Sequence, residues 1–247
     1  MDVGFKTDKG KRRVNNEDAF FVLRNDGVFI VADGVGGNNS GEIASRTAVN
    51  EVAQFVEDHP PKGLRGRELR DYFYKAIRGA NYRVFDMAQR YVENSGMATT
   101  MVVAYIDGTK LFVCNVGDSR AYVYGGGVLR QISEDHTYVN ALVKAGVISK
   151  DEALTHEDKN MITKAVGAEQ DVEPDFFELE LMKGDCVLLC TDGLYGEVDA
   201  EDMAAIFAEG ESMTDTCAAL VDAANDGGGS DNITVICIRI TEDEAHE

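Results

Sequence analysis

Two apolar stretches far apart in the chain end in the same way, in an aspartate followed by a glycine. VFIVADG covers residues 28–34, and CVLLCTDG covers residues 186–193. Uninterrupted apolar runs of this length are typical of strands that are covered on both faces of a sheet. A single Asp-Gly is more often a turn than a site. Here, however, the pattern places Asp33 and Asp192 at the ends of core strands, where a carboxylate loses much of its contact with water.

Three further segments place acidic residues beside core strands. Asp118 follows LFVCNV, Asp231 precedes NITVICIRI, and Glu17 and Asp18 precede AFFVL. Partly buried carboxylates need positive partners, and Lys and Arg are scarce beside most of these positions. A bound cation is the simplest compensation, and ligands that are all oxygen favour Mg²⁺, Mn²⁺ or Ca²⁺. Carboxylates from several distant segments suit a two-metal centre, whose ions lie about 3.5–4 Å apart and share a water.

Composition and motifs argue against several other functions. The formal net charge of −20 disfavours nucleic acid and anionic membranes as partners. The four histidines are scattered and no H-E-x-x-H occurs, so catalytic zinc is not expected. DGVGGNNSG matches neither common nucleotide-binding glycine pattern. The five cysteines form no C-x-x-C, and we find neither a signal peptide nor an apolar run of about 20 residues, so we expect a soluble cytoplasmic protein.

The remaining pattern predicts antiparallel sheet layers with helices packed outside them, an α+β class. Amphipathic periodicity predicts long helices over 40–58 and about 67–93, and two short helices over 200–209 and 213–224. Hairpin signals at 25–27 and 107–108 favour antiparallel pairing. With three prolines and no linker-like tract, we expect a single domain.

Five motifs together carry a resemblance to a known family. RVNNED (13–18), VADGVGG (31–37), GDSRAY (117–122), TDGL (191–194) and SDNITV (230–235) occur in the order seen in metal-dependent protein phosphatases of type 2C. The chain resembles that family over about residues 4–240, and most resembles compact bacterial members that oppose Hanks-type serine/threonine kinases. The resemblance implies a four-layer α-β-β-α sandwich, with two antiparallel sheets flanked by helix pairs and a binuclear metal centre at one end of the sheets.

The resemblance also implies ligands for two Mn²⁺ or Mg²⁺ ions. Asp33 corresponds to the carboxylate that bridges both ions, and Asp192 and Asp231 correspond to its partners on the first ion. Glu17 and the backbone carbonyl of Gly34 correspond to ligands of the second ion. These positions are carried over one by one from the motifs above.

The resemblance also extends to further site positions, but the chain lacks a histidine that family members carry. Asp18 is similar to a residue that holds metal-bound water, and Asp118, with Asp192, resembles a weaker third-metal site. Animal members have a histidine, proposed as general acid, where this chain has Val35, and many bacterial members have one where it has Asn38. The sequence therefore offers no obvious side-chain acid for the leaving group, which a metal-bound water could protonate instead.

The resemblance implies a single catalytic domain over 1–242, with a flap subdomain at about 134–169 and an acidic tail at 243–247. A segment placed between Asp118 and Asp192 would lie near the site, and such flaps often govern substrate access. His136 and His156 are expected to solvate or cap rather than catalyse.

The implied function is a phosphoprotein phosphatase. Water between two divalent ions is acidified and attacks the phosphorus of phosphoserine or phosphothreonine, and Arg13 corresponds to the arginine that grips the phosphate. Expected partners are phosphorylated proteins, including a cognate serine/threonine kinase, and we expect a monomer. The alternatives are a non-catalytic metal-binding regulatory module on the same fold, which the retained ligands disfavour, and an acidic Ca²⁺-binding protein, which lacks an EF-hand pattern here.

Overall fold

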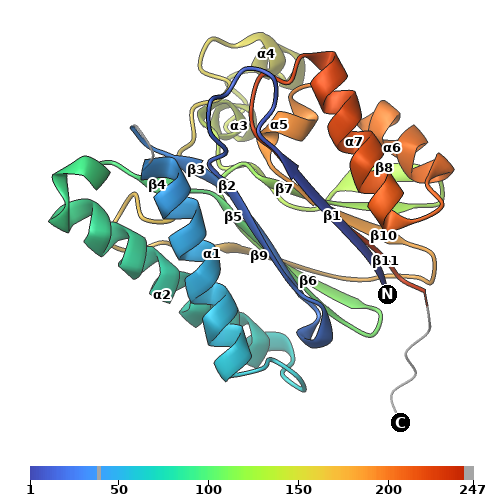
Figure 1. The fold of residues 1–247 in the computed structure, drawn as a ribbon, viewed down its shortest axis with the longest axis horizontal. Coiled ribbons are helices and arrows are strands. Elements are labelled where there is room, and N and C mark those ends of the chain that lie inside the picture. Colours follow the sequence, from blue (N-terminus) through green and yellow to red (C-terminus); the bar gives the residue numbers. More distant parts are fainter. Residues whose placement is uncertain (38–39, 242–247) are drawn as a thin grey trace.

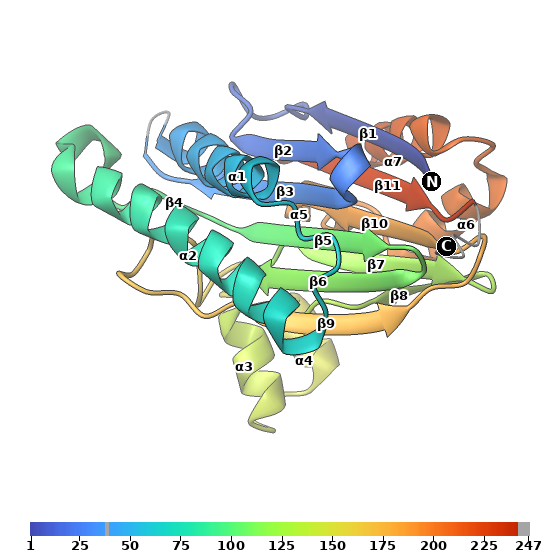
Figure 2. The same cartoon turned by 90° about the horizontal axis from the view of Figure 1, so that it is seen from below.

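The computed structural model describes residues 1–37 and 40–241. Two antiparallel β-sheets pack face to face, and helices cover the outer face of each sheet (Figure 1). Figure 2 shows the same layers from below, with α1 and α2 on one side of the sheets and α6 and α7 on the other. Here α1 is Ser40–Asp58, α2 is Gly66–Arg90, α6 is Ala200–Glu209 and α7 is Met213–Gly227. The expected α+β class and four-layer sandwich are confirmed.

The sheet beneath α1 and α2 has the order β2-β3-β5-β6-β9, and the short strand β4 also pairs with β3. All of its pairings are antiparallel, as the hairpin signals predicted. Its strands are β2 (Asp18–Leu23), β3 (Val28–Val35), β4 (Ala98–Thr99), β5 (Met101–Asp107), β6 (Lys110–Val116) and β9 (Asp175–Glu180).

The sheet beneath α6 and α7 has the order β1-β11-β10-β7-β8, again with antiparallel pairings. The one-turn helix α5 (Asp192–Tyr195) follows its central strand directly. The strands are β1 (Asp2–Asp8), β7 (Arg120–Gly125), β8 (Val128–Gln131), β10 (Cys186–Cys190) and β11 (Ile233–Arg239).

The apolar runs of the sequence are explained by three stacked cores. Successive side chains of a strand point to opposite faces. In β3, Ile30 packs in the core shared with α1 and α2, whereas Val31 packs in the core between the two sheets. In β10, Leu188 packs in the core shared with α6 and α7, whereas Leu189 packs between the sheets. A strand covered on both faces has no position left for an exposed polar side chain.

The helices follow the predicted periodicity except near their ends. The predicted bounds of α1 and α6 agree with the observed ones, and α7 runs three residues further than predicted. The prediction for α2 was wrong at its end: the helix stops at Arg90, and Tyr91 adopts an extended conformation before a short 3₁₀ turn. The apolar spacing of α2 continues to Tyr91, yet Tyr91 is 50% exposed, and Ile43 in the first turn of α1 is 37% exposed. Periodicity identifies the face of a helix but says little about burial in its terminal turns.

The segment 134–169 leaves the sandwich between β8 and β9 and carries two short helices, α3 (Tyr138–Lys144) and α4 (Lys150–Thr155). We refer to residues 134–169 as the insert. Its standing as a flap subdomain, and the single-domain layout, remain predictions, and the tail at 243–247 lies outside the described residues.

Within residues 1–37 and 40–241, no helix is both long and apolar enough to cross a membrane.

Candidate metal centre

The predicted carboxylates lie where the strands of both sheets end, because antiparallel pairing sets the end of one strand beside the start of the next. Asp18 and Asp33 are directly opposite each other in the β2–β3 register. In the other sheet, Cys190 at the end of β10 pairs with Val235 near the start of β11. Asp192 and Asp231 lie just beyond these paired ends.

Asp33 and Asp18 are held by threonines from other segments. The backbone N–H of Asp33 donates to the hydroxyl of Thr100 at 2.8 Å, and its carbonyl accepts from the Thr100 N–H at 2.9 Å. Asp18 is buried, and its Oδ2 accepts a hydrogen bond from the hydroxyl of Thr191 at 2.8 Å. The backbone of Asp33 and the carboxylate of Asp18 are therefore fixed by threonines from other segments.

Asp192 and Asp231 are brought together by a close approach of backbone. A β-carbon on Gly193 would lie 2.0 Å from the carbonyl oxygen of Asn232, so only glycine fits there. Asn232 is itself buried and donates through its backbone N–H to Asp231 Oδ1 at 2.7 Å. Its side chain accepts from the N–H of Glu17 at 2.8 Å, and so connects both halves of the site.

Glu17 and Gly34 meet over Gly41, in the first turn of α1. A β-carbon on Gly41 would lie 2.6 Å from Glu17 Oε2 and 2.7 Å from the carbonyl oxygen of Gly34. The backbone of Glu17 is held by Gly34, whose N–H donates to its carbonyl at 3.2 Å, and by the hydroxyl of Ser45 at 2.5 Å. The two oxygens predicted for the second ion therefore lie side by side above a position without a side chain.

The carboxylates are electrostatically strained. Burial raises the pKa of Asp18 to about 7, with repulsion from Asp192 and Asp231 adding to the shift. Burial likewise raises the pKa of Asp118 to about 7, with repulsion from Asp192 next. The pKa of Asp33 is raised well above its usual range by burial and then by the charge of Asp18, and the pKa of Asp192 is raised by burial and then by Asp231. A cation among them would relieve both causes.

The donor set fits a hard divalent cation by its chemistry. All of the predicted ligands are oxygens, and Asp18 Oδ1 and Asp192 Oδ1 are buried without a hydrogen-bond partner in the part of the chain that the structure describes. The distances between these side chains do not by themselves define a metal site. Among the described residues, no three Asp, Glu, His or Cys side chains lie close enough together to hold a metal ion. Asp231 is instead engaged by a cation of the protein itself.

That cation is Arg13, which lies on the loop after β1. Its Nη2 donates to Asp231 Oδ2 at 2.6 Å, and its side chain is half exposed. The predicted phosphate-binding arginine therefore lies at the carboxylates and reaches solvent. Val35 is 47% exposed near the end of β3 and offers no proton, whereas Asn38 falls outside the described residues.

A cavity of about 760 Å³ opens beside the carboxylates. Its lining includes Asp118, Asp192 and Asp231, together with Val139 and Leu154 of the insert. The insert therefore borders the site, as its place between Asp118 and Asp192 in the sequence predicted.

Sequence reasoning missed the polar residues that hold the carboxylates. Asn232 and Thr191 lie inside two of the quoted motifs, directly beside Asp231 and Asp192, and adjacency to an acidic residue was the available signal. Thr100 gives no such signal, because its contact with Asp33 spans 67 positions of the chain.

A four-layer α-β-β-α sandwich with carboxylates at the ends of both sheets is the architecture expected of a metal-dependent protein phosphatase. The sequence profile of the family described as Protein phosphatase 2C matches residues 8–226. The chain belongs to this family.

Named relatives and solved structures agree with this assignment. The serine/threonine phosphatase stp of Listeria monocytogenes is 35% identical over 241 residues, which cover 96% of this chain and 95% of that protein. The crystal structure of the serine/threonine phosphatase Stp1 from Staphylococcus aureus superposes with a TM-score of 0.91 at 33% identity, over 98% of this chain and 96% of that one. A structure of the PstP catalytic domain in complex with two manganese ions has a TM-score of 0.85 at 30% identity, over 97% of this chain and 98% of that one.

The expected enzyme class is confirmed by these findings. The chain is a protein-serine/threonine phosphatase, and the catalytic reading is favoured over a non-catalytic module on the same fold. Its substrates are accordingly phosphorylated proteins.

Proposed function

We propose that this chain hydrolyses phosphoserine and phosphothreonine in proteins with two Mn²⁺ or Mg²⁺ ions held by its own carboxylates. The observation that carries the proposal is the convergence of carboxylates from separate strand ends. Their pKa values are raised, and Asp18 Oδ1 and Asp192 Oδ1 have no hydrogen-bond partner among the described residues. In the proposed assignment the metal ligands are Glu17, Asp33, the carbonyl of Gly34, Asp192 and Asp231.

Bound divalent ions at this position acidify a water and offset the negative charge of the phosphoryl group. The chain supplies the rest. Arg13 binds phosphate oxygens through its planar guanidinium, which is half exposed beside the site. Asp18, anchored by Thr191, orients water at the centre. We assign Asp118, with Asp192, to a third and weaker ion.

The assignment is tested with Asp33→Asn and Asp192→Asn. We expect both variants to lose turnover of p-nitrophenyl phosphate in Mn²⁺ and to bind fewer ions in isothermal titration calorimetry, because each loses a charged ligand. Asp151→Asn, an exposed change on α4, is the matched control and should keep both properties. Full turnover in either site variant would refute the assignment, and metal binding without any turnover in the wild type would favour the regulatory module.

Three further features are part of the proposal. The substrates include a cognate serine/threonine kinase, because a phosphatase of phosphoserine and phosphothreonine opposes a kinase that phosphorylates the same residues. A cytoplasmic location is supported by five cysteines that are all free and buried, as is typical of a reducing compartment. A monomeric state is supported by the net charge of −20, which opposes self-association, and analytical ultracentrifugation tests it.

A further inference from the structure

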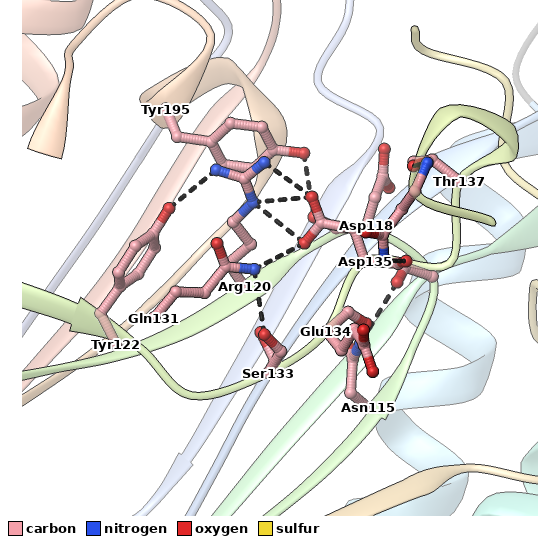
Figure 3. A network of polar contacts seen from close by, with 12 residues as sticks. Asn115, Asp118, Arg120, Tyr122, Gln131, Ser133, Glu134, Asp135, Thr137 and Tyr195 are labelled. Carbon is pink, nitrogen blue, oxygen red and sulfur yellow. Dashed lines mark hydrogen bonds and ion pairs between the residues drawn. The ribbon is translucent and has the colours of Figure 1, made fainter. Parts of the chain in front are cut away.

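We propose that Arg120 is a positioning residue that fixes Asp118 and the base of the insert with one partly buried guanidinium. The proposal rests on the proposed function, because it concerns how the insert and Asp118 are held beside the same site. Arg120 is the first residue of β7 and lies two positions after Asp118. Figure 3 shows the surrounding polar network.

One set of contacts runs from Arg120 to the insert. Its Nε lies 3.0 Å from both carboxylate oxygens of Asp135, and its Nη2 donates to Asp135 Oδ2 at 2.6 Å (Figure 3). Asp135 is the second residue of the insert, and its carbonyl accepts from the side chain of Asn140 in α3 at 2.7 Å. The guanidinium therefore anchors the point where the insert leaves the sheet.

A second set of contacts runs from Arg120 to Asp118. The guanidinium carbon lies 3.5 Å from the centroid of the Tyr195 ring, which is a cation–π contact. Tyr195 in turn donates its hydroxyl to the carbonyl oxygen of Asp118 at 2.9 Å. Because Tyr195 closes the short helix that Asp192 begins, this stack also holds the segment that carries Asp192.

The opposite side of the Asp118 loop is tied to the insert directly. The N–H of Gly117 donates to His136 Nδ1 at 3.0 Å, and the N–H of His136 donates to the Gly117 carbonyl at 3.0 Å. Asn115 adds a bond of 2.8 Å to the carbonyl of Glu134. These contacts with Glu134 and His136 fix the loop from one side, and Arg120 fixes it from the other.

Arginine is the residue type that this role requires. A planar guanidinium can form a two-pronged bond with a carboxylate at its edge while its face stacks on an aromatic ring. The remaining Nη1 donates to the hydroxyl of Tyr122 at 2.9 Å. Lysine keeps the charge but cannot make these contacts at once. Arg120, Asp135 and Tyr195 all line the cavity beside Asp118, so a shift of the guanidinium would change the cavity wall and the carboxylate together.

The first test removes one hydroxyl. Tyr195→Phe keeps the ring over Arg120 and loses only the bond to the Asp118 carbonyl, so we expect kcat in Mn²⁺ to fall roughly fivefold with KM unchanged. Tyr124→Phe, on the same strand as Arg120, is the matched control and should behave as the wild type. Combined with Asp118→Asn, Tyr195→Phe should cause no further loss. If the kcat losses of the two single variants multiplied in the double variant, Tyr195 would not act through Asp118, and this part of the proposal would be overturned.

The second test weakens both sets of Arg120 contacts, those with Asp135 and those with Tyr195. Arg120→Lys should lower kcat roughly tenfold or more and should speed amide hydrogen exchange across residues 134–155, whereas Tyr195→Phe should leave that exchange unchanged. Arg130→Lys, an exposed change on β8, is the control. Wild-type kcat and wild-type exchange in Arg120→Lys would overturn the proposal. If the wild-type protein itself fails to hydrolyse phosphate esters in Mn²⁺, the proposed function fails, and the exchange measurement still decides whether Arg120 holds the insert.

Discussion

Arg13 and Asp231 lie 218 positions apart in the chain, yet Arg13 Nη2 is 2.6 Å from Asp231 Oδ2. The hydrogen bond to Asp231 raises the pKa of the Arg13 guanidinium, and attraction from Asp33 and Asp192 adds to it, against the opposing effect of partial burial. The guanidinium therefore lies between the carboxylate cluster and solvent. A phosphate that approaches the carboxylates from solvent would meet this positive group first.

Replacing Arg13 should weaken substrate binding more than it affects the metal centre. We expect Arg13→Ala to raise KM for a phosphothreonine peptide roughly tenfold or more, because a charge-assisted contact is lost. Mn²⁺ binding should persist, since no proposed ligand is changed. Steady-state kinetics and calorimetry measure the two effects. Arg12→Ala, at the exposed neighbouring position, is the control, and an unaltered KM in Arg13→Ala would contradict the role.

A single methyl group at Gly41 should disable the site. In Gly41→Ala the new carbon would collide with Glu17 Oε2 and the Gly34 carbonyl, the two oxygens assigned to the second ion. We expect at least a 100-fold loss of kcat/KM, with loss of one bound Mn²⁺ per chain. Gly79→Ala in α2 meets no atom within 4 Å and should retain full activity, with about 0.5–1 kcal/mol of added stability. A fully active Gly41→Ala would mean that the second-ion assignment is wrong.

Divalent ions should stabilise the fold as well as support turnover. EDTA should abolish turnover and added Mn²⁺ should restore it. Ions that bind only the folded state at a hundredfold excess over Kd contribute about 2.7 kcal/mol, which corresponds to a rise in Tm of roughly 5–10 °C for a chain of this size. Differential scanning calorimetry measures the shift, and Asp33→Asn should lose most of it. A Tm that does not change when Mn²⁺ is added would contradict the proposed metal centre.

The metal-free protein should lose stability as pH rises. Asp18 and Asp118 have folded-state pKa values of about 7 against an ordinary 3.8, chiefly through burial. A raised carboxylate pKa means that the folded state holds the proton more tightly, so the stabilisation is complete below about pH 4 and is lost as pH rises through about 7. Without metal, the Tm of the wild-type protein should fall from pH 5 to pH 8, and the Tm of Asp118→Asn should fall less. An equal fall in both proteins would show that Asp118 does not contribute.

Much of the sandwich could be predicted locally. The uninterrupted runs at 28–32 and 186–190 predicted strands covered on both faces, and Ile30 and Val31 do face different cores. Helix periodicity placed α1 and α6 at their observed bounds. Terminal turns were the weak point, as Tyr91 shows, because burial there depends on what lies beyond the helix. The shared position of the carboxylates at strand ends predicted that some of them would lie close together, and Asp18 and Asp33 do lie opposite each other.

By itself the sequence determined which segments become doubly covered strands and which residues stand at their ends, because both properties are set by side chains within a few positions of one another. Only the tertiary structure decided which ends meet. The bond from Tyr195 to Asp118, the ion pair of Arg13 with Asp231 and the fit of Glu17 against Gly41 join positions that the chain separates widely. Their distances are set by the pairing of strands and the packing of helices from separate parts of the chain, and no spacing along the sequence encodes them.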